Sequence, residues 1–212
     1  MRIIPRVRRL YWSVLFRLSK RWTLAGIEIG VFLPDAANEP LVEERIDDAF
    51  TLLGAFGPKY LTRVQSLADG ILLFGTVGAL GSWNKDARLI RISQDFIADP
   101  ATKPVHIAAT MVHEATHAWL DQRGFVYTPQ CRARIEAICY RAQSTFAARI
   151  PGCQDVALEY EQCAQVVLDQ PDDEWSDEAF HLRAAEHFIE LGVPEWLARR
   201  LSRFSSVLPN ER

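Results

Sequence analysis

Five consecutive residues, His113-Glu114-Ala115-Thr116-His117, form an H-E-x-x-H pattern with the spacing of a metal site. On a helix, side chains four positions apart lie on the same face, so the two imidazoles can bind one Zn²⁺ ion between them. Glu114 follows the first histidine, where its carboxylate can reach a metal-bound water. The pattern therefore indicates metal-assisted hydrolysis.

The segment that carries this motif, Val105 to Gln122, contains neither glycine nor proline. The breaker cluster 99–104 precedes it, and Gly124 follows as a C-terminal cap. Apolar residues recur at helical spacing along it: Ile107, Met111, Ala115, Ala118 and Trp119. We therefore expect a partly buried helix, in which a metal site would exclude bulk water.

A third ligand is needed, because a catalytic zinc usually has three protein ligands and one open position. The next histidine after His117 is His181, so the elongated pattern with a nearby third histidine is absent. Glu136 stands in an apolar stretch of a helix that we expect from Pro129 to about Ile150, and a buried carboxylate needs a partner. A metal ion is one such partner. The alternative is a salt bridge to Arg132, Arg134 or Arg141, with Glu159 and Glu161 as reserve ligands.

His113, Glu114, His117 and a glutamate on the following helix resemble the gluzincin group of zinc metallopeptidases, over residues 113 to 136. The resemblance implies His113, His117 and Glu136 as zinc ligands, Glu114 as general base, and a peptide or protein substrate. In some gluzincins an acidic residue four positions after the glutamate ligand orients a ligand histidine. Tyr140 has that position here, so either its hydroxyl takes this role or the outer contacts differ.

Other residues near the motif have two interpretations each. The Thr110 hydroxyl either hydrogen-bonds to His113 and orients it or bonds to the backbone of its own helix. His106 lies two turns before His113, where it lines the substrate cleft or is a polar residue near the helix start. Asp121 is interpreted as a solvated charge near the helix end. The candidates for a donor to the developing oxyanion are Tyr127, Tyr140, Tyr160, His181 and His187.

The predicted fold class is α+β and mainly helical, in a single zincin-like domain over residues 1–212. A small antiparallel or mixed sheet precedes the metal-binding helix. Its strands are expected at 71–74 and 89–93, and the stretch from Gly78 to Ile92, with a turn near 84–86, resembles the edge strand of zincin-like folds. A further extended segment is expected at 26–33. The remaining helices are expected at about 6–22, 40–55, 58–68, 155–169, 175–191 and 194–207.

The composition is that of an ordinary globular chain, with 49% apolar residues, 24% charged residues and a net charge of −3. This balance gives no argument for nucleic acid as a partner. Residues 1–22, however, form a basic amphipathic helix, with seven basic residues and no acidic one. Either this helix packs on the domain with its arginines in water, which we favour, or it makes peripheral contact with an anionic membrane or a partner.

The four cysteines form no C-x-x-C pair, and no secretion signal is recognisable, so we expect reduced thiols and a cytoplasmic protein. Two functions are compatible with the motif. The first is a zinc-dependent metallopeptidase. The second is a peptide-binding or regulatory protein that has the zincin scaffold without turnover. Glu114 favours the first, because a binding module needs no base at that position.

Overall fold

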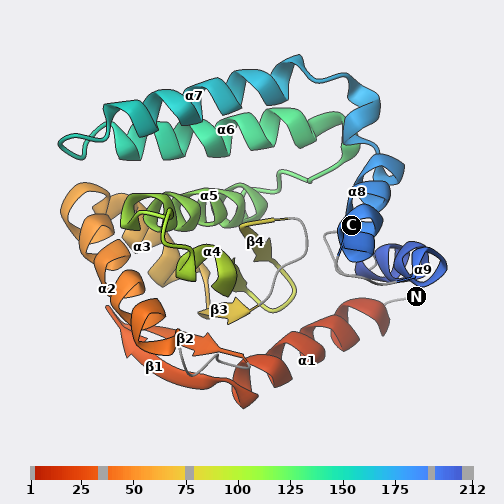
Figure 1. Ribbon diagram of the computed structural model, residues 1–212, viewed down its shortest axis with the longest axis horizontal. Coiled ribbons are helices and arrows are strands. Elements are labelled where there is room, and N and C mark those ends of the chain that lie inside the picture. Colours follow the sequence, from red (N-terminus) through yellow and green to blue (C-terminus); the bar gives the residue numbers. More distant parts are fainter. Residues whose placement is uncertain (1–2, 33–37, 75–78, 191–193, 207–212) are drawn as a thin grey trace.

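The computed structural model describes residues 3–32, 38–74, 79–190 and 194–206. In chain order its elements are α1 (Ile3–Leu18), β1 (Lys20–Leu24), β2 (Ile27–Val31), α2 (Glu39–Phe56), α3 (Pro58–Leu67), β3 (Gly70–Phe74), β4 (Gly81–Asn84), β5 (Leu89–Ser93), α4 (Gln94–Ala98), α5 (Pro104–Gln122), α6 (Pro129–Ala147), α7 (Gln154–Asp169), a 3-10 turn η1 (Asp172–Trp175), α8 (Asp177–Glu190) and α9 (Glu195–Ser206). This confirms a mainly helical α+β architecture (Figure 1).

The sheet is mixed and has the strand order β1-β2-β3-β5-β4. Its centre is parallel, with β3 between β2 and β5, whereas β1 and β4 are antiparallel to their neighbours. The central strand β3 reads as a continuous apolar run because both of its faces are covered. The strands expected at 71–74 and 89–93 are confirmed as β3 and β5, and β4, within the stretch 78–92 expected to hold an edge strand, pairs with β5. The Asn84 side chain accepts a hydrogen bond from the Ala87 backbone in the turn between them.

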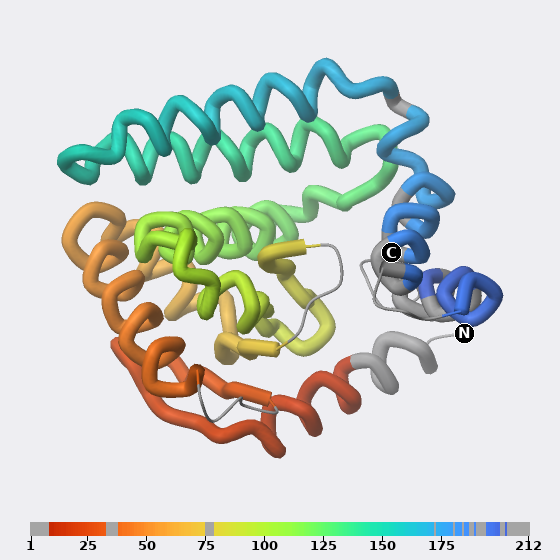
Figure 2. The backbone as a smooth tube through the Cα atoms, in the orientation of Figure 1, coloured from red at the N-terminus to blue at the C-terminus, as the bar shows by residue number. Residues whose placement is uncertain are grey.

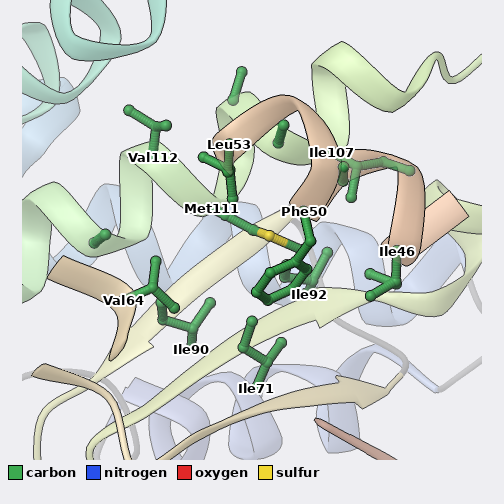
Figure 3. Packing of buried hydrophobic residues seen from close by; sticks show 14 of the residues in the cluster. Ile46, Phe50, Leu53, Val64, Ile71, Ile90, Ile92, Ile107, Met111 and Val112 are labelled. Atoms are coloured by element: carbon green, nitrogen blue, oxygen red, sulfur yellow. The ribbon is translucent and has the colours of Figure 1, made fainter. Parts of the chain in front are cut away.

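The main core lies between one face of the sheet and the helices α2, α3 and α5. Figure 3 shows Ile71, Ile90 and Ile92 of the sheet packed with Phe50 of α2 and Met111 of α5. A smaller cluster covers the opposite face, where Trp12 and Phe16 of α1 pack on Leu72 and Leu89. Helix α5 is therefore central. The sheet lies on one side of it, and the α6–α7 pair lies on the other (Figure 1).

The N-terminal helix was expected over 6–22, and that boundary is wrong. The helix ends at Leu18, and residues 20–24 form the edge strand β1, antiparallel to β2. Ala25 and Gly26, both at positive φ, turn the chain between these strands (Figure 2). Two consecutive residues at positive φ are required by the type I′ turn, one of the common turns of two-residue hairpins. The short helix α4 was not expected. The helix expected from 175 begins at Asp177 as α8, and the 3-10 turn η1 lies just before it.

No described helix combines the length and the apolar character that crossing a lipid bilayer requires.

Candidate metal centre

Helices α5 and α6 bring the side chains of His113, His117 and Glu136 together. The Nε2 atoms of the two histidines are 3.1 Å apart. The Glu136 carboxylate lies 3.1 Å from Nε2 of His113 and 3.3 Å from Nε2 of His117. Atoms bound at about 2.0–2.1 Å to a tetrahedral zinc are about 3.3 Å from one another. The three residues therefore fit the spacing of a three-ligand zinc site.

This arrangement follows from the local sequence of both helices. Pro104 and Pro129 each stand at the first turn, where a missing N–H costs nothing. The alanine-rich face of α5 lets other elements approach closely, and α6 packs along it. A helix buried on nearly all sides is normally apolar throughout, so a polar side chain inside it needs a reason. Glu114, 4% exposed, is such a residue.

The side chain of Gln143 orients His113. The sequence did not predict this contact. The amide oxygen of Gln143 lies 2.8 Å from Nδ1 of His113, and an amide oxygen can only accept. Nδ1 therefore carries a proton, and in the neutral imidazole Nε2 has the lone pair that a metal ion would take. Of the two alternatives for this role, a Tyr140 hydroxyl or a different contact, the structure has the different contact, and Tyr140 packs its ring edge-on against His113 with ring centroids 5.1 Å apart. Gln143 is seven residues after Glu136, on the same face of α6, and this offset is the signal that could have found it.

Tyr127 holds the carboxylate of Glu136. Its hydroxyl donates a 2.6 Å hydrogen bond to Oε1 of Glu136, and its ring lies edge-on to His117. Burial and the negative charge of Glu136 raise the pKa of Tyr127 well above its usual range, so the hydroxyl keeps its proton. Tyr160 contacts the main core, and His181 lies on α8, whereas the side chain of His187 falls outside the described residues.

The remaining candidates near the motif have ordinary positions. The Thr110 hydroxyl donates to the backbone oxygen of His106, so the backbone interpretation is confirmed for Thr110. His106 is half-buried in the first turn of α5. Asp121, interpreted as a solvated charge, is half-buried and lies 3.4 Å from the indole nitrogen of Trp83, which donates to it. That contact links the end of α5 to β4.

Cys139 is a second candidate for the third ligand. One ligand atom each from His113, His117 and Cys139 lie within 4.8 Å of one another, a set that could hold a metal ion. Glu136 is the better candidate, since its oxygens lie 3.1 and 3.3 Å from the Nε2 atoms, as atoms bound to one zinc ion would. In addition, burial raises the pKa of the Cys139 thiol well above its usual range, and a metal binds the thiolate. All four cysteines are free thiols.

The charges of the three residues are coupled. Burial alone would raise the pKa of Glu136, but the charge of His117 and the hydrogen bonds from both histidines hold it well below its usual range. Burial alone would lower the pKa of His113, but its hydrogen bond and charge interaction with Glu136 raise it to about 9. Without a metal, His113 is thus protonated at neutral pH and pairs with an ionised Glu136.

Zinc binding near neutral pH is therefore expected to release about one proton per ion from His113, because a metal takes only the neutral imidazole. The number of protons released should fall as the pH rises through about 9, because His113 of the metal-free protein has then already lost its proton. Calorimetry in buffers of different ionisation enthalpy measures this number. Equal binding enthalpies in all buffers at neutral pH would contradict the assignment.

Glu114 is turned toward the edge strand β4. Burial raises the pKa of its carboxyl, and the two histidines lower it in part. A Cβ on Gly81 of β4 would lie 3.0 Å from Oε1 of Glu114 and 2.7 Å from the methyl group of Thr110. Only glycine leaves room for Glu114 at this position. The strand thus approaches the carboxylate directly.

The Gly81→Ala variant is expected to lose about 1–3 kcal/mol of unfolding free energy, because Thr110 and Glu114 must shift to admit the methyl group. Gly54→Ala is the matched control. Nothing lies within 4 Å of a Cβ there, and alanine favours the helix by about 0.5–1 kcal/mol. Urea denaturation of both variants measures the two effects. A Gly81→Ala protein as stable as the wild type would show that the contact is loose.

A small pocket that is open to solvent lies beside His117. Its lining mixes apolar and polar side chains, with Lys85 and Asp121 as the charged residues. The lining residues are Trp83, Lys85, His117, Leu120, Asp121, Phe125, Tyr127 and Ile135. Such a pocket can take a small group of a ligand that is bound next to His117.

No family model, curated protein or solved structure matches this chain. Any assignment of function therefore rests on the geometry of its own side chains: three residues that could bind a metal ion, a buried glutamate beside them, an edge strand and a small pocket.

Proposed function

We propose that the protein is a gluzincin-type, zinc-dependent metallopeptidase with a zincin-like fold. The observation that carries the proposal is the 3.1–3.3 Å spacing of the side-chain atoms of His113, His117 and Glu136. Zinc held there would polarise the scissile carbonyl and make water acidic enough to react near neutral pH. Glu114, adjacent to His113 on α5, has no part in the ligand triangle and is available as the base.

The chain's own residues supply the other steps. Glu114 would take the proton of the attacking water and deliver it to the leaving amine, as a general base and then a general acid. Gln143 and Tyr127 would hold His113 and Glu136 in their orientations. Strand β4 pairs only with β5 within the described sheet, so its outer edge can pair with an extended peptide.

A peptide on the β4 edge would pass both Glu114 and the pocket. Gly81 of this strand faces Glu114, and Trp83, two residues on, lines the pocket beside His117. We infer that the pocket accepts a small side chain next to the scissile bond. The proposal places the protein in the reducing cytoplasm, in agreement with its four free thiols.

The test is metal analysis combined with hydrolysis. Protein purified without added metal should contain about one zinc per chain, and cleavage of a mixed peptide library should stop with a zinc chelator and return with zinc. Protein without zinc, even after zinc is supplied, would remove the proposal. Protein with zinc but without any cleavage would point to the binding module on the same scaffold.

A further inference from the structure

Helix α1 has two apolar faces, and among the described residues one of them packs on the protein while the other is exposed. Trp12 and Phe16 are buried against the sheet, and Trp12 also stacks on the guanidinium of Arg91. The other face is in solvent, with the following exposed fractions: Leu10 64%, Tyr11 48%, Val14 42% and Leu18 72%. Leu10, Val14 and Leu18 are four positions apart, so they form one line along the helix. An apolar stripe in solvent marks an interaction surface.

The exposed charges described on this helix are positive, and Arg17 lies directly beside the stripe. Arg9 and Arg17 are exposed, and neither forms an ion pair with any described residue. Lys20 and Arg21, by contrast, are balanced by Glu39, Glu43 and Glu28. The first 22 residues contain no acidic side chain at all. A partner that fits this surface would be apolar where it meets the stripe and negatively charged where it meets the arginines.

The shape of the surface favours a flat partner. Helix α1 lies at the outer margin of the molecule, on the side of the sheet opposite to α5 and α6 (Figure 1). Its exposed apolar side chains form a ridge along a single helix. An interfacial amphipathic helix presents such a ridge to a bilayer and lies parallel to the membrane surface. Tyrosine is also common at the headgroup level of membranes.

We propose that α1 docks this protein on the surface of an anionic membrane. Leu10, Val14 and Leu18 enter the headgroup region, and Arg9 and Arg17 contact lipid phosphates. The inference goes beyond the proposed function and does not rest on it, since it uses none of the metal-site residues.

The experiment is flotation of the full chain with two kinds of vesicle, phosphatidylcholine alone and phosphatidylcholine with about one quarter phosphatidylserine. The test variant is Val14→Glu with Leu18→Glu. The matched control is Val166→Glu with Leu158→Glu, since these residues of α7 are also exposed, by 58% and 60%. Circular dichroism and the thermal midpoint check that each variant folds.

Wild type and the α7 control should float with the anionic vesicles only. The α1 variant should bind at least about tenfold more weakly, and Arg9→Gln with Arg17→Gln about tenfold more weakly. Wild type that stays in the pellet overturns the proposal, as does equal flotation of the α1 variant or equal binding to both vesicles. A wild-type dimer that the α1 variant converts to monomer, without flotation, assigns the face to a second copy and also overturns it.

Discussion

Replacement of Glu114 by glutamine is expected to abolish hydrolysis and to leave the zinc content unchanged. Glutamine has the same size but cannot accept a proton at its amide, and loss of a general base costs about 10²–10⁴-fold in rate. The side chain is buried beside Gly81, where the substitution changes charge without changing volume. The measurements are kcat on a cleaved peptide and the metal content of the same preparation.

Asp121→Asn is the matched control for Glu114→Gln. It removes another half-buried carboxylate from α5, and this one lines the pocket. Its rate should remain within about tenfold of wild type, because Asp121 contacts Trp83 and none of the three ligands. Full activity of Glu114→Gln would disprove the proposed chemistry, and loss of its zinc would give Glu114 a structural role.

The second large effect is expected on metal affinity. His113→Ala and Glu136→Gln should each weaken zinc binding by more than about 100-fold, since loss of an outer-shell partner alone costs about 10–100-fold. Tyr127→Phe removes only the hydrogen bond to Glu136, so it should weaken zinc binding by about 10–100-fold. Competition with a chromophoric chelator measures all of these affinities.

Cys139→Ser decides between the two possible ligand sets. With Glu136 as the third ligand, the serine variant should bind zinc about as tightly as wild type, because the substitution is nearly isosteric. If Cys139→Ser loses zinc and Glu136→Gln keeps it, the ligands are His113, His117 and Cys139. Circular dichroism of the metal-free proteins separates loss of a ligand from loss of the fold.

The helices that carry the site were predictable because their signals are local. Pro104 and Pro129 mark the first turns of α5 and α6, and apolar residues at helical spacing extend from there. The strand β1 was missed because the basic N-terminal pattern was extended past Leu18. The turn that defines the strand, at Ala25 and Gly26, lies further along the chain.

The site itself was predictable only in part. The spacing of the His113 and His117 side chains is fixed within about one helix turn, so the sequence predicts it. Glu136 was predicted from the resemblance to gluzincins and from its apolar neighbours. The contacts of Gln143, Tyr127 and Cys139 depend on how α6 is rotated against α5. That rotation is a product of packing along the whole length of both helices, and no short motif encodes it.

The ligand residues lie close together in the chain as well as in space. His113 and Glu136 are 23 positions apart, and the orienting contact of Gln143 spans 30. Closing so short a loop has a small entropic cost, whereas the parallel pairing of β2 with β3 joins segments 42 positions apart, for example Ile29 with Ile71, and is slower. The α5–α6 hairpin can therefore form before the sheet does. An ion captured at that stage would act as a folding nucleus and accelerate refolding of the rest of the chain.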